Sequence, residues 1–325
     1  MRSILLKEYG NTDVMYLGES ELPQLKPNEI LVKVEAFAIN RADILQRKGK
    51  YPSPEGASPL MGLEVAGVVY DANGSKRYQQ GDRICGLVPG GGYAEYTAVD
   101  EEMLIPISNE MTFEEAAAIP EVFLTAFLAL SWLGKVSENE NVLIHAAAGG
   151  VGTAAIQLAK NMGANVIITA SNHKHETCKR LGANVCIDYK NNSWADEVVN
   201  TLGKNKINVV LDFVGGQYFN DNLSVMAMDS RMVMLALMGC GDVERANLRY
   251  IIGKRIAIHG STLRNRSLEF QRKLCREFVE FAMPLFETKK LCPVIDSVMD
   301  WTAIAKAHER MEANEHTGKI VMRVG

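Results

Sequence analysis

The sequence predicts an α/β protein with two domains, one small and mostly β, the other built on a doubly wound parallel sheet. Up to about residue 100, short apolar runs are broken by turn residues, which is typical of a mostly β domain. From about residue 120, strand-like runs of four to seven residues alternate with helical stretches, which indicates βαβ units. The 325 residues, 47% of them hydrophobic, are also more than one compact core usually needs.

In the first part, five apolar runs are expected to form strands. They are residues 2–7, 29–40, 63–70, 82–88 and 93–99. The second run is the clearest, because its apolar residues share one face at period two. These residues are Ile30, Val32, Val34, Ala36 and Ala38.

In the second part, six runs with helices between them fit a doubly wound sheet. They are residues 141–146, 165–170, 184–188, 207–213, 232–238 and 256–261. After Ser261, Leu274, Phe278 and Phe281 repeat at helical spacing, and we expect Pro284 to stop this helix. Residues 318–324 read as a closing strand. Because this tail has no sheet of its own, we expect it to fold back on the first domain.

Charge and hydropathy favour a small-molecule partner. The net charge is -4 and charges of both signs are interleaved, so neither a nucleic-acid site nor a membrane surface is expected. No apolar run approaches the roughly 20 residues that span a bilayer, and the N-terminus lacks the apolar core of a signal peptide. We therefore expect a cytoplasmic protein.

The cysteines and histidines do not predict a disulfide framework or a metal site. The six cysteines contain no C-x-x-C pair, so we expect reduced and mostly buried thiols. They are Cys85, Cys178, Cys186, Cys240, Cys275 and Cys292. His173 and His175 lie in a polar stretch without a cysteine or carboxylate at ligand spacing, so solvated side chains are expected there.

Residues 144–164 run from an apolar strand through a glycine-rich turn into a helix. The turn has the frame Ala147-x-Gly149-x-x-Gly152, with alanine in the first position of the dinucleotide fingerprint. Gly149 lets the backbone approach a pyrophosphate, Gly152 lets the helix pack on the strand, and the helix N-terminus supplies free N–H groups. The alternative is a turn that needs glycine only for its bend. The strand before the turn and the βα units after it favour a dinucleotide.

The end of the next strand predicts which dinucleotide is bound. NAD is usually held there by an acid that hydrogen-bonds the ribose hydroxyls. This chain has Ser171, Asn172, His173 and Lys174, with no carboxylate before Glu176. Hydroxyl and ammonium donors suit a 2′-phosphate, so NADPH is the expected cofactor. Lys174 is the candidate for the positive charge, the alternative being a surface lysine with no partner.

Several motifs together resemble a known family. They are "INRADILQRKGKYPSPEGAS", "GGGYAEY", "AAAIPEVFLTAF", "HAAAGGVG", "LMGCGD" and "ANEHTGKIVM". In order and over essentially the whole chain, they resemble the zinc-free, NADPH-dependent quinone oxidoreductases of the medium-chain dehydrogenase/reductase superfamily, closest to the p53-inducible branch. The resemblance implies a GroES-like catalytic domain from residues 1–121 and 264–325, and a Rossmann NADP-binding domain from residues 122–263. It also implies a cofactor cleft where the domains meet, and a homodimer.

The zinc-dependent members of that superfamily have a catalytic Cys, a Gly-His-Glu motif and a lobe of four cysteines. Here the matching stretches run from Asn40 to Asp43 and from Gly62 to Glu64, and the cysteine lobe is missing. Soft and imidazole ligands are therefore absent from these positions, and no zinc is expected.

The resemblance also implies which residues contact the cofactor. Thr125 is expected near the nicotinamide ribose and the phosphates, with Gly149, Gly150, Val151 and Gly152 under the pyrophosphate. The other expected contacts are Ser171, Lys174 and Tyr189 at the 2′-phosphate and adenine, Met238, Gly239, Leu263 and Arg264 along the nicotinamide, and Lys319 at the adenosine end. The loop after Ser171 is one residue shorter than the common family loop, so Tyr189 is matched better than Lys174.

The resemblance also places three candidate residues at the mouth of the cleft. Asn40 is expected to hydrogen-bond substrate or nicotinamide, the alternative being a turn-capping asparagine. Asp43 would orient Asn40 or a neighbour, or else form a local cap or salt bridge. Tyr51 would form a wall or donate to the acceptor, unless its hydroxyl is simply solvated. Donors near the oxygen of a quinone help because negative charge develops there.

Three functions are compatible with these residues. The first is an NADPH:quinone oxidoreductase, in which solvent protonates the hydroquinone anion. The second is an NADPH-dependent enone or alkenal reductase, which must protonate a carbon and for which Tyr51 is the candidate donor. The third is a non-catalytic NADPH-binding protein, which no basic or aromatic-rich segment favours.

Overall fold

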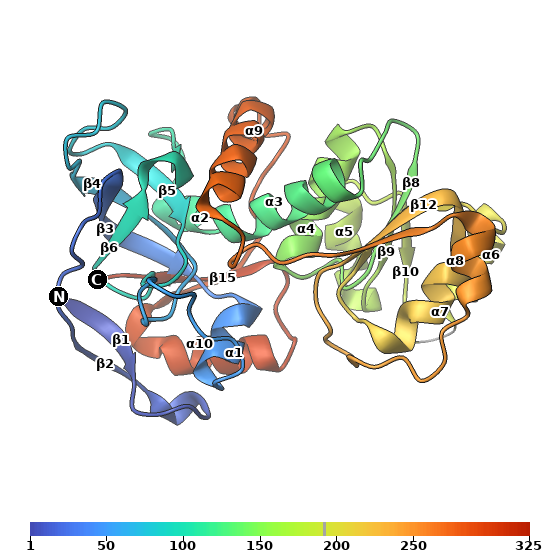
Figure 1. Cartoon of the computed structure of the whole chain (residues 1–325), viewed down its shortest axis with the longest axis horizontal. Coiled ribbons are helices and arrows are strands. Elements are labelled where there is room, and N and C mark those ends of the chain that lie inside the picture. Colours follow the sequence, from blue (N-terminus) through green and yellow to red (C-terminus); the bar gives the residue numbers. More distant parts are fainter. Residues whose placement is uncertain (191–192) are drawn as a thin grey trace. The chain divides into compact units, whose positions relative to one another are not determined.

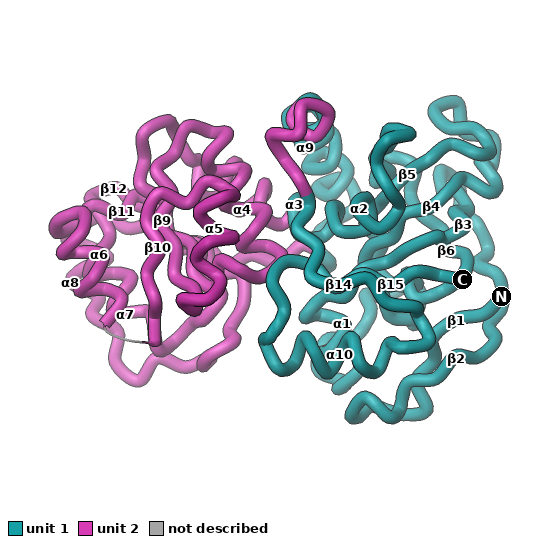
Figure 2. Tube along the Cα trace, turned by 180° about the vertical axis from the view of Figure 1, so that it is seen from behind, with its two compact units in different colours: residues 1–124, 264–284, 293–325 teal, residues 125–263, 285–292 magenta. Residues whose placement is uncertain are grey.

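The computed structural model describes residues 1–190 and 193–325, which form two units (Figure 1, Figure 2). Unit 1 consists of residues 1–124, 264–284 and 293–325. Unit 2 consists of residues 125–263 and 285–292. Unit 1 is therefore assembled from both ends of the chain, whereas most of unit 2 is one continuous segment.

Unit 1 is mostly β. A small antiparallel ribbon pairs β1 (Arg2–Leu6) with β2 (Met15–Glu19). The larger sheet has the order β14-β15-β3-β4-β5-β7, with β6 paired to β3. Its strands are β3 (Glu29–Ala38), β4 (Glu64–Asp71), β5 (Arg83–Leu87), β6 (Tyr96–Asp100), β7 (Leu104–Pro106), β14 (Ile295–Asp300) and β15 (Lys319–Arg323). The last strand, β15, runs antiparallel to β3, so the end of the chain lies inside the sheet formed by its beginning.

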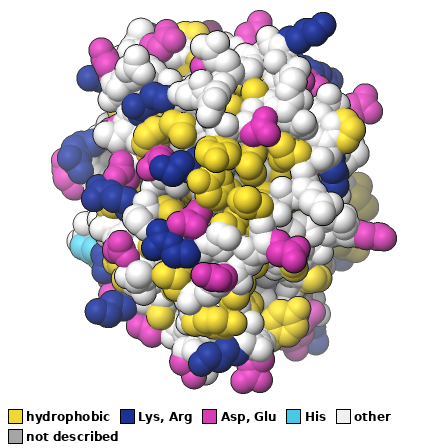
Figure 3. Space-filling view, turned by 90° about the vertical axis from the view of Figure 1, so that its left-hand side faces the viewer, with side chains coloured by type: hydrophobic (Ala, Val, Ile, Leu, Met, Phe, Trp, Pro, Cys, Tyr) yellow, Lys and Arg dark blue, Asp and Glu magenta, His cyan; other side chains and the backbone are white. Residues whose placement is uncertain are grey.

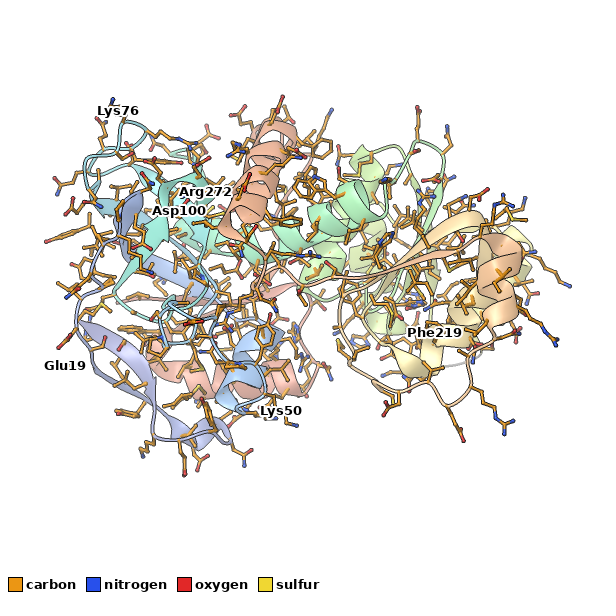
Figure 4. The ribbon with its side chains drawn as sticks, in the orientation of Figure 1. Glu19, Lys50, Lys76, Asp100, Phe219 and Arg272 are labelled. Carbon is orange, nitrogen blue, oxygen red and sulfur yellow. The ribbon has the colours of Figure 1, made fainter. Side chains whose placement is uncertain are left out.

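The helices of unit 1 are mostly short. They are α1 (Arg41–Arg47), α2 (Phe113–Ala117) and α10 (Ile304–Glu312), while α3 (Pro120–Phe127) and α9 (Leu268–Glu287) run on into unit 2. A pair of ionic hydrogen bonds joins α9 to the end of β6. Arg272 donates through Nε at 3.0 Å and NH2 at 2.5 Å to the two carboxylate oxygens of Asp100, and the two side chains lie together in Figure 4.

Unit 2 is a six-stranded parallel sheet with the order β10-β9-β8-β11-β12-β13. The strands are β8 (Asn141–Ile144), β9 (Asn165–Thr169), β10 (Val185–Ile187), β11 (Ile207–Asp212), β12 (Met226–Met234) and β13 (Ala257–Gly260). Figure 1 shows α4 (Gly150–Asn161) and α5 (His175–Leu181) on one face of this sheet. The other face is covered by α6 (Trp194–Leu202), α7 (Gly216–Val225) and α8 (Leu248–Lys254). The predicted fold class, a mostly β domain with a doubly wound parallel sheet, is confirmed.

Two details of the sequence prediction are wrong. The helix containing Phe278 does not stop at Pro284, because α9 continues to Glu287. Proline removes one backbone donor, but Phe278, Ala282 and Phe286 form a buried stripe at spacing four that continues past it. Strand β12 begins at Met226 rather than Met232. The prediction missed its first residues because Asp229, Ser230 and Arg231 interrupt the apolar run.

The surface mixes charges of both signs. On the face shown in Figure 3, Lys and Arg side chains alternate with Asp and Glu around a central group of hydrophobic side chains. In residues 1–190 and 193–325, no helix is both long enough and apolar enough to cross a bilayer.

Candidate cofactor and active site

The carboxyl ends of the parallel strands in unit 2 place the predicted cofactor residues at one edge of the sheet. After β8 the chain moves outward through β9 to β10, and then returns to build β11, β12 and β13 on the other side of β8. The crevice outside the carboxyl ends at such a reversal is the usual ligand site of this architecture. The turn holding Gly149 follows β8, Ser171 follows β9, and Met238 and Gly239 follow β12.

The glycine turn has the geometry that a pyrophosphate needs. Gly149 is the N-cap of α4, whose first-turn N–H groups lie at the end of a 12-residue helix. A Cβ on Gly152 would lie 2.5 Å from both Cα and O of Ala147, so only glycine lets the helix approach the turn this closely. Ala146 holds a left-handed conformation with φ of 46°. These residues fit a dinucleotide.

Gly149 offers a test of that fit, because its Cβ position is open. An added Cβ would meet only the Ala146 carbonyl oxygen, at 3.4 Å. We expect Gly149→Ala to leave thermal stability unchanged and to weaken NADPH binding by about tenfold or more, since the methyl group would occupy the space of the phosphates. Fluorescence titration measures the affinity. Gly253→Ala, in α8 with no atom within 4 Å of its Cβ, is the control. Wild-type affinity in Gly149→Ala would mean that the phosphates lie elsewhere.

The predicted 2′-phosphate residues lie at the neighbouring strand ends. The Ser171 and Tyr189 hydroxyl oxygens are 3.4 Å apart, although 18 residues separate them in the chain. Lys174 follows in a short helical turn, residues 172–174, and its own backbone N–H donates to the Ser171 carbonyl at 2.9 Å. Asp188, the acid next to Tyr189, accepts the backbone N–H of Lys190 at 3.0 Å. Two hydroxyl groups and a nearby lysine therefore gather at this end.

A buried polar network that sequence reasoning missed lies beneath these loops. The His145 ring bonds Thr169 Oγ1 at 2.9 Å through Nδ1 and Asn222 Oδ1 at 2.8 Å through Nε2. Burial lowers the pKa of His145. Asn222 donates to Asp212, whose other oxygen accepts the backbone N–H groups of Val214 and Gly215. A polar residue at the end of each apolar strand was the available signal.

The same network stabilises the loop that contains Met238 and Gly239. The Met238 N–H donates to the Phe213 carbonyl at 3.0 Å, and the Gly239 N–H donates to the Val214 carbonyl at 2.9 Å. The loops after β11 and β12 are thus bonded to each other.

In unit 1, Lys319 lies at the centre of a buried ionic network. Its Nζ donates to Glu64 Oε1 at 2.7 Å, to Asn40 Oδ1 at 2.6 Å and to the Ile39 carbonyl at 2.7 Å. Asn40 Nδ2 in turn donates to Glu64 Oε1 at 2.8 Å. Both polar atoms of the Asn40 side chain are therefore engaged. Lys319 was predicted to contact the adenosine end of the cofactor, and the structure places its ammonium group in this network.

Asp43 supports Asn40 from the first turn of α1. Its Oδ2 accepts the backbone N–H of Asn40 at 2.7 Å, which fixes the start of the helix. Its Oδ1 has no partner of good hydrogen-bond geometry among the described residues. Burial raises the pKa of Asp43 to about 6, although its interactions with the Asn40 backbone and the Tyr93 hydroxyl oppose this.

Arg264 fixes the loop that contains Tyr51. It donates to the Pro89 carbonyl at 2.8 Å, to Gln46 Oε1 at 2.8 Å and to Ser53 Oγ at 3.1 Å. Its guanidinium group also lies over the Tyr51 ring, 5.2 Å from the centroid. Arg264 was predicted to contact the nicotinamide. In the structure its side chain is buried against the loop that contains Tyr51.

Two acids of this region were not among the predicted site residues. Glu64 is fully buried within an apolar strand, and the Glu121 backbone N–H donates to its Oε2 at 2.8 Å. Glu121 is the second residue of α3, which also contains Thr125. An acid inside an apolar run was the signal for Glu64, and an acid directly after Pro120 was the signal for Glu121. The predicted contact Leu263 is buried in unit 2.

Within the described ranges, no three His, Cys, Asp or Glu side chains are grouped so that they could hold a metal ion. The buried Glu64 carboxylate is instead paired with the Lys319 ammonium.

Two parts of the chain match known protein families. Residues 26–109 match the alcohol dehydrogenase GroES-like domain, and residues 150–280 match the family described as zinc-binding dehydrogenase. The chain belongs to the medium-chain dehydrogenase/reductase superfamily. The first match lies in unit 1 and the second covers most of unit 2, so this superfamily accounts for both units.

Relatives within the superfamily have different names and sizes. The quinone oxidoreductase of Pongo abelii is 28% identical, over 99% of this chain and 97% of that protein. The synaptic vesicle membrane protein VAT-1 homolog of Danio rerio is 29% identical, over 99% of this chain and 69% of that protein. A highly reducing polyketide synthase of Cordyceps militaris is 29% identical over 92% of this chain, which spans 12% of the length of that synthase.

Solved structures of superfamily members have the same fold. CurK enoyl reductase superposes with a TM-score of 0.88 at 27% identity, over 100% of this chain and 99% of that one. A mycobacterial protein complexed with NADPH superposes with a TM-score of 0.87 at 25% identity, over 99% of this chain and 100% of that one. The chain is thus an oxidoreductase of this superfamily with an NAD(P)-binding unit.

Proposed function

We propose that the protein is a zinc-independent NADPH:quinone oxidoreductase. The observation that supports the cofactor is the glycine turn at the N-terminus of α4, with the Ser171 and Tyr189 hydroxyl groups at the adjacent strand end. The relationship to quinone oxidoreductases supports the acceptor class.

The residues of unit 2 would hold NADPH along the edge of its sheet. The backbone N–H groups from Gly149 to Gly152 would bind the pyrophosphate, and Ser171, Lys174 and Tyr189 would bind the 2′-phosphate. Thr125, Met238, Gly239 and Leu263 are the further proposed contacts. When bound, NADPH supplies the hydride.

The residues of unit 1 would hold the acceptor. Among residues 1–190 and 193–325, none bonds the Tyr51 hydroxyl group, so this group is available to donate to an acceptor oxygen on which negative charge develops. Asn40 is already engaged by Lys319 and Glu64. We therefore propose that Asn40 acts mainly by positioning this network, and that Tyr51 contacts the acceptor.

The first experiment is fluorescence titration with NADPH and NADH, followed by NADPH consumption with a panel of quinones and alkenals. We expect NADPH to bind more tightly than NADH. Lys174→Ala should weaken NADPH binding by about tenfold and leave NADH unchanged, because a charge-assisted contact to phosphate is lost. Lys179→Ala, an exposed change in α5, is the control. Equal affinities for the two cofactors, or no oxidation with any quinone, would contradict the proposal.

An enone or alkenal double-bond reductase is the second candidate. It is favoured by the similarity to CurK enoyl reductase and by the acid Glu121, whose negative charge raises the pKa of Tyr51 after burial does. Turnover of a quinone and of an alkenal by one preparation distinguishes the two activities.

A further inference from the structure

We propose that Glu121 is a catalytic acid, which transfers a proton to the acceptor after hydride addition. This inference rests on the proposed reductase function. It makes the site suited to acceptors that must be protonated on carbon, such as enones and alkenals, as well as to quinones.

The position of Glu121 distinguishes it from the other acids of the network. Its backbone N–H is held by Glu64 Oε2 at 2.8 Å, which fixes the first turn of α3 against the buried network. Glu64 and Asp43 have no exposed surface, whereas Glu121 is partly exposed. Of these three carboxyl groups, Glu121 is therefore the one that a bound acceptor or solvent can reach.

The two nearby cations are engaged with other groups. The three hydrogens of the Lys319 ammonium group match its three acceptors, Glu64, Asn40 and the Ile39 carbonyl. Arg264 donates to the backbone carbonyls of Pro89 and Tyr51 and to the side-chain oxygens of Gln46 and Ser53. Among the described residues, none forms a hydrogen bond or ion pair with the Glu121 carboxyl group. A carboxyl group in this setting is more stable when protonated, because no cation is directly paired with it.

The charges around Glu121 agree with that protonation state. Burial raises the pKa of Glu121 to about 8, with a further increase from the negative charge of Glu64 and a smaller one from Asp43. Lys319 and Arg264 act in the opposite direction. At neutral pH the group therefore holds a proton that it can donate.

Glu121 also lies near the residues proposed to contact the reactants. The pKa of Tyr51 is raised by burial and, secondly, by the charge of Glu121. Thr125, the proposed nicotinamide-ribose contact, follows Glu121 by four residues in α3, which is the spacing of neighbours on one helical face. The charge of Glu121 thus acts on the proposed acceptor wall, and Glu121 shares a helical face with a proposed cofactor contact.

The proton-transfer step is balanced. Bound NADPH would supply a hydride with its two electrons to the acceptor and would leave as NADP⁺. The O–H bond of Glu121 breaks, its electron pair stays on the carboxylate, and the proton forms a C–H bond in an enone product or an O–H bond in a hydroquinone. Solvent then returns a proton to Glu121, which the partial exposure of the residue allows.

Glu121→Gln keeps the size of the side chain and removes the acidic proton. With an alkenal, we expect kcat to fall by about 100-fold while the affinity for NADPH is kept. With a quinone the fall should be much smaller, because solvent protonates an oxygen anion quickly. The wild-type rate with the alkenal should decline as pH rises through about 8, and Glu121→Gln should lack this decline. Glu115→Gln, a polar helix-start change in α2, is the control.

Two further measurements test the proposal even if Glu121→Gln folds poorly. Glu121→Asp should keep the pH-dependent decline, with intermediate turnover. In the wild type the folded pKa is above the ordinary 4.5, so stability is greatest below that pH and falls as pH rises toward 8; Glu121→Gln should reduce this fall. If Glu121→Gln has the kcat and the pH profile of the wild type, only the role of Glu121 is overturned. If the wild type fails to consume NADPH with any quinone or alkenal tested, the proposed function is overturned, and this inference with it.

Discussion

Lys319→Met should lower the free energy of unfolding by about 3–5 kcal/mol, the usual cost of leaving one partner of a buried ion pair without the other. Lys319 and Glu64 are both almost fully buried, and the ammonium group donates one hydrogen bond each to Glu64, Asn40 and the Ile39 carbonyl. Methionine fills a similar volume, so the loss would report the missing charge and hydrogen bonds rather than a cavity.

Urea unfolding at neutral pH measures this effect. Arg255→Met, which breaks the solvent-exposed pair with Asp229, is the control and should change stability little. Combining Lys319→Met with Glu64→Gln should recover part of the loss, because the uncompensated buried charge is then removed. A Lys319→Met protein as stable as the wild type would show that water or a rearranged side chain solvates Glu64.

Gly152→Ala should both destabilise the protein and abolish NADPH binding. The new Cβ would lie 2.5 Å from the Cα and O atoms of Ala147, and backbone atoms cannot rotate away as a flexible side chain can. Helix α4 must therefore move off the turn, which costs about 1–3 kcal/mol and displaces the N–H groups that would bind the pyrophosphate.

Thermal unfolding and NADPH titration together test this prediction. Gly149→Ala should affect binding alone and Gly253→Ala should affect neither property, so the three variants separate packing from ligand contact. Normal binding by Gly152→Ala would show that the turn is not the pyrophosphate site.

The sequence was sufficient to predict the fold class because each domain has its own hydrophobic period. The alternation from Ile30 to Ala38 and the apolar runs of the mostly buried strands β8, β9 and β11 both follow from side-chain burial. Strand β14 was missed because most of its residues are only half-buried and show no clear alternation. Pro284 was overestimated as a helix stop, since its cost is local and the packing of Phe286 is not visible to a local rule.

The site was predictable in part. The family resemblance proposed Asn40 and Asp43, and the spacing of the glycines proposed the turn before α4. In the structure both groups have their conformation fixed by neighbours in the sequence. The partners of Asn40 were not predictable in this way, because Lys319 and Glu64 reach it from two other strands. A pairing between distant segments leaves no periodic trace in either segment. The roles of these residues in catalysis remain predictions.

The placement of β15 between β3 and β14 affects the order in which the protein is completed during synthesis. Lys319 and Asn40 are 279 residues apart, whereas the segment 125–263 that forms most of unit 2 is continuous. A nascent chain would therefore be able to build its parallel sheet on the ribosome while Glu64 still lacked its cation. Until the last strand emerges, the first domain has an open sheet edge beside an unpaired acid, which makes that interval the one in which a chaperone or a protease would act on it.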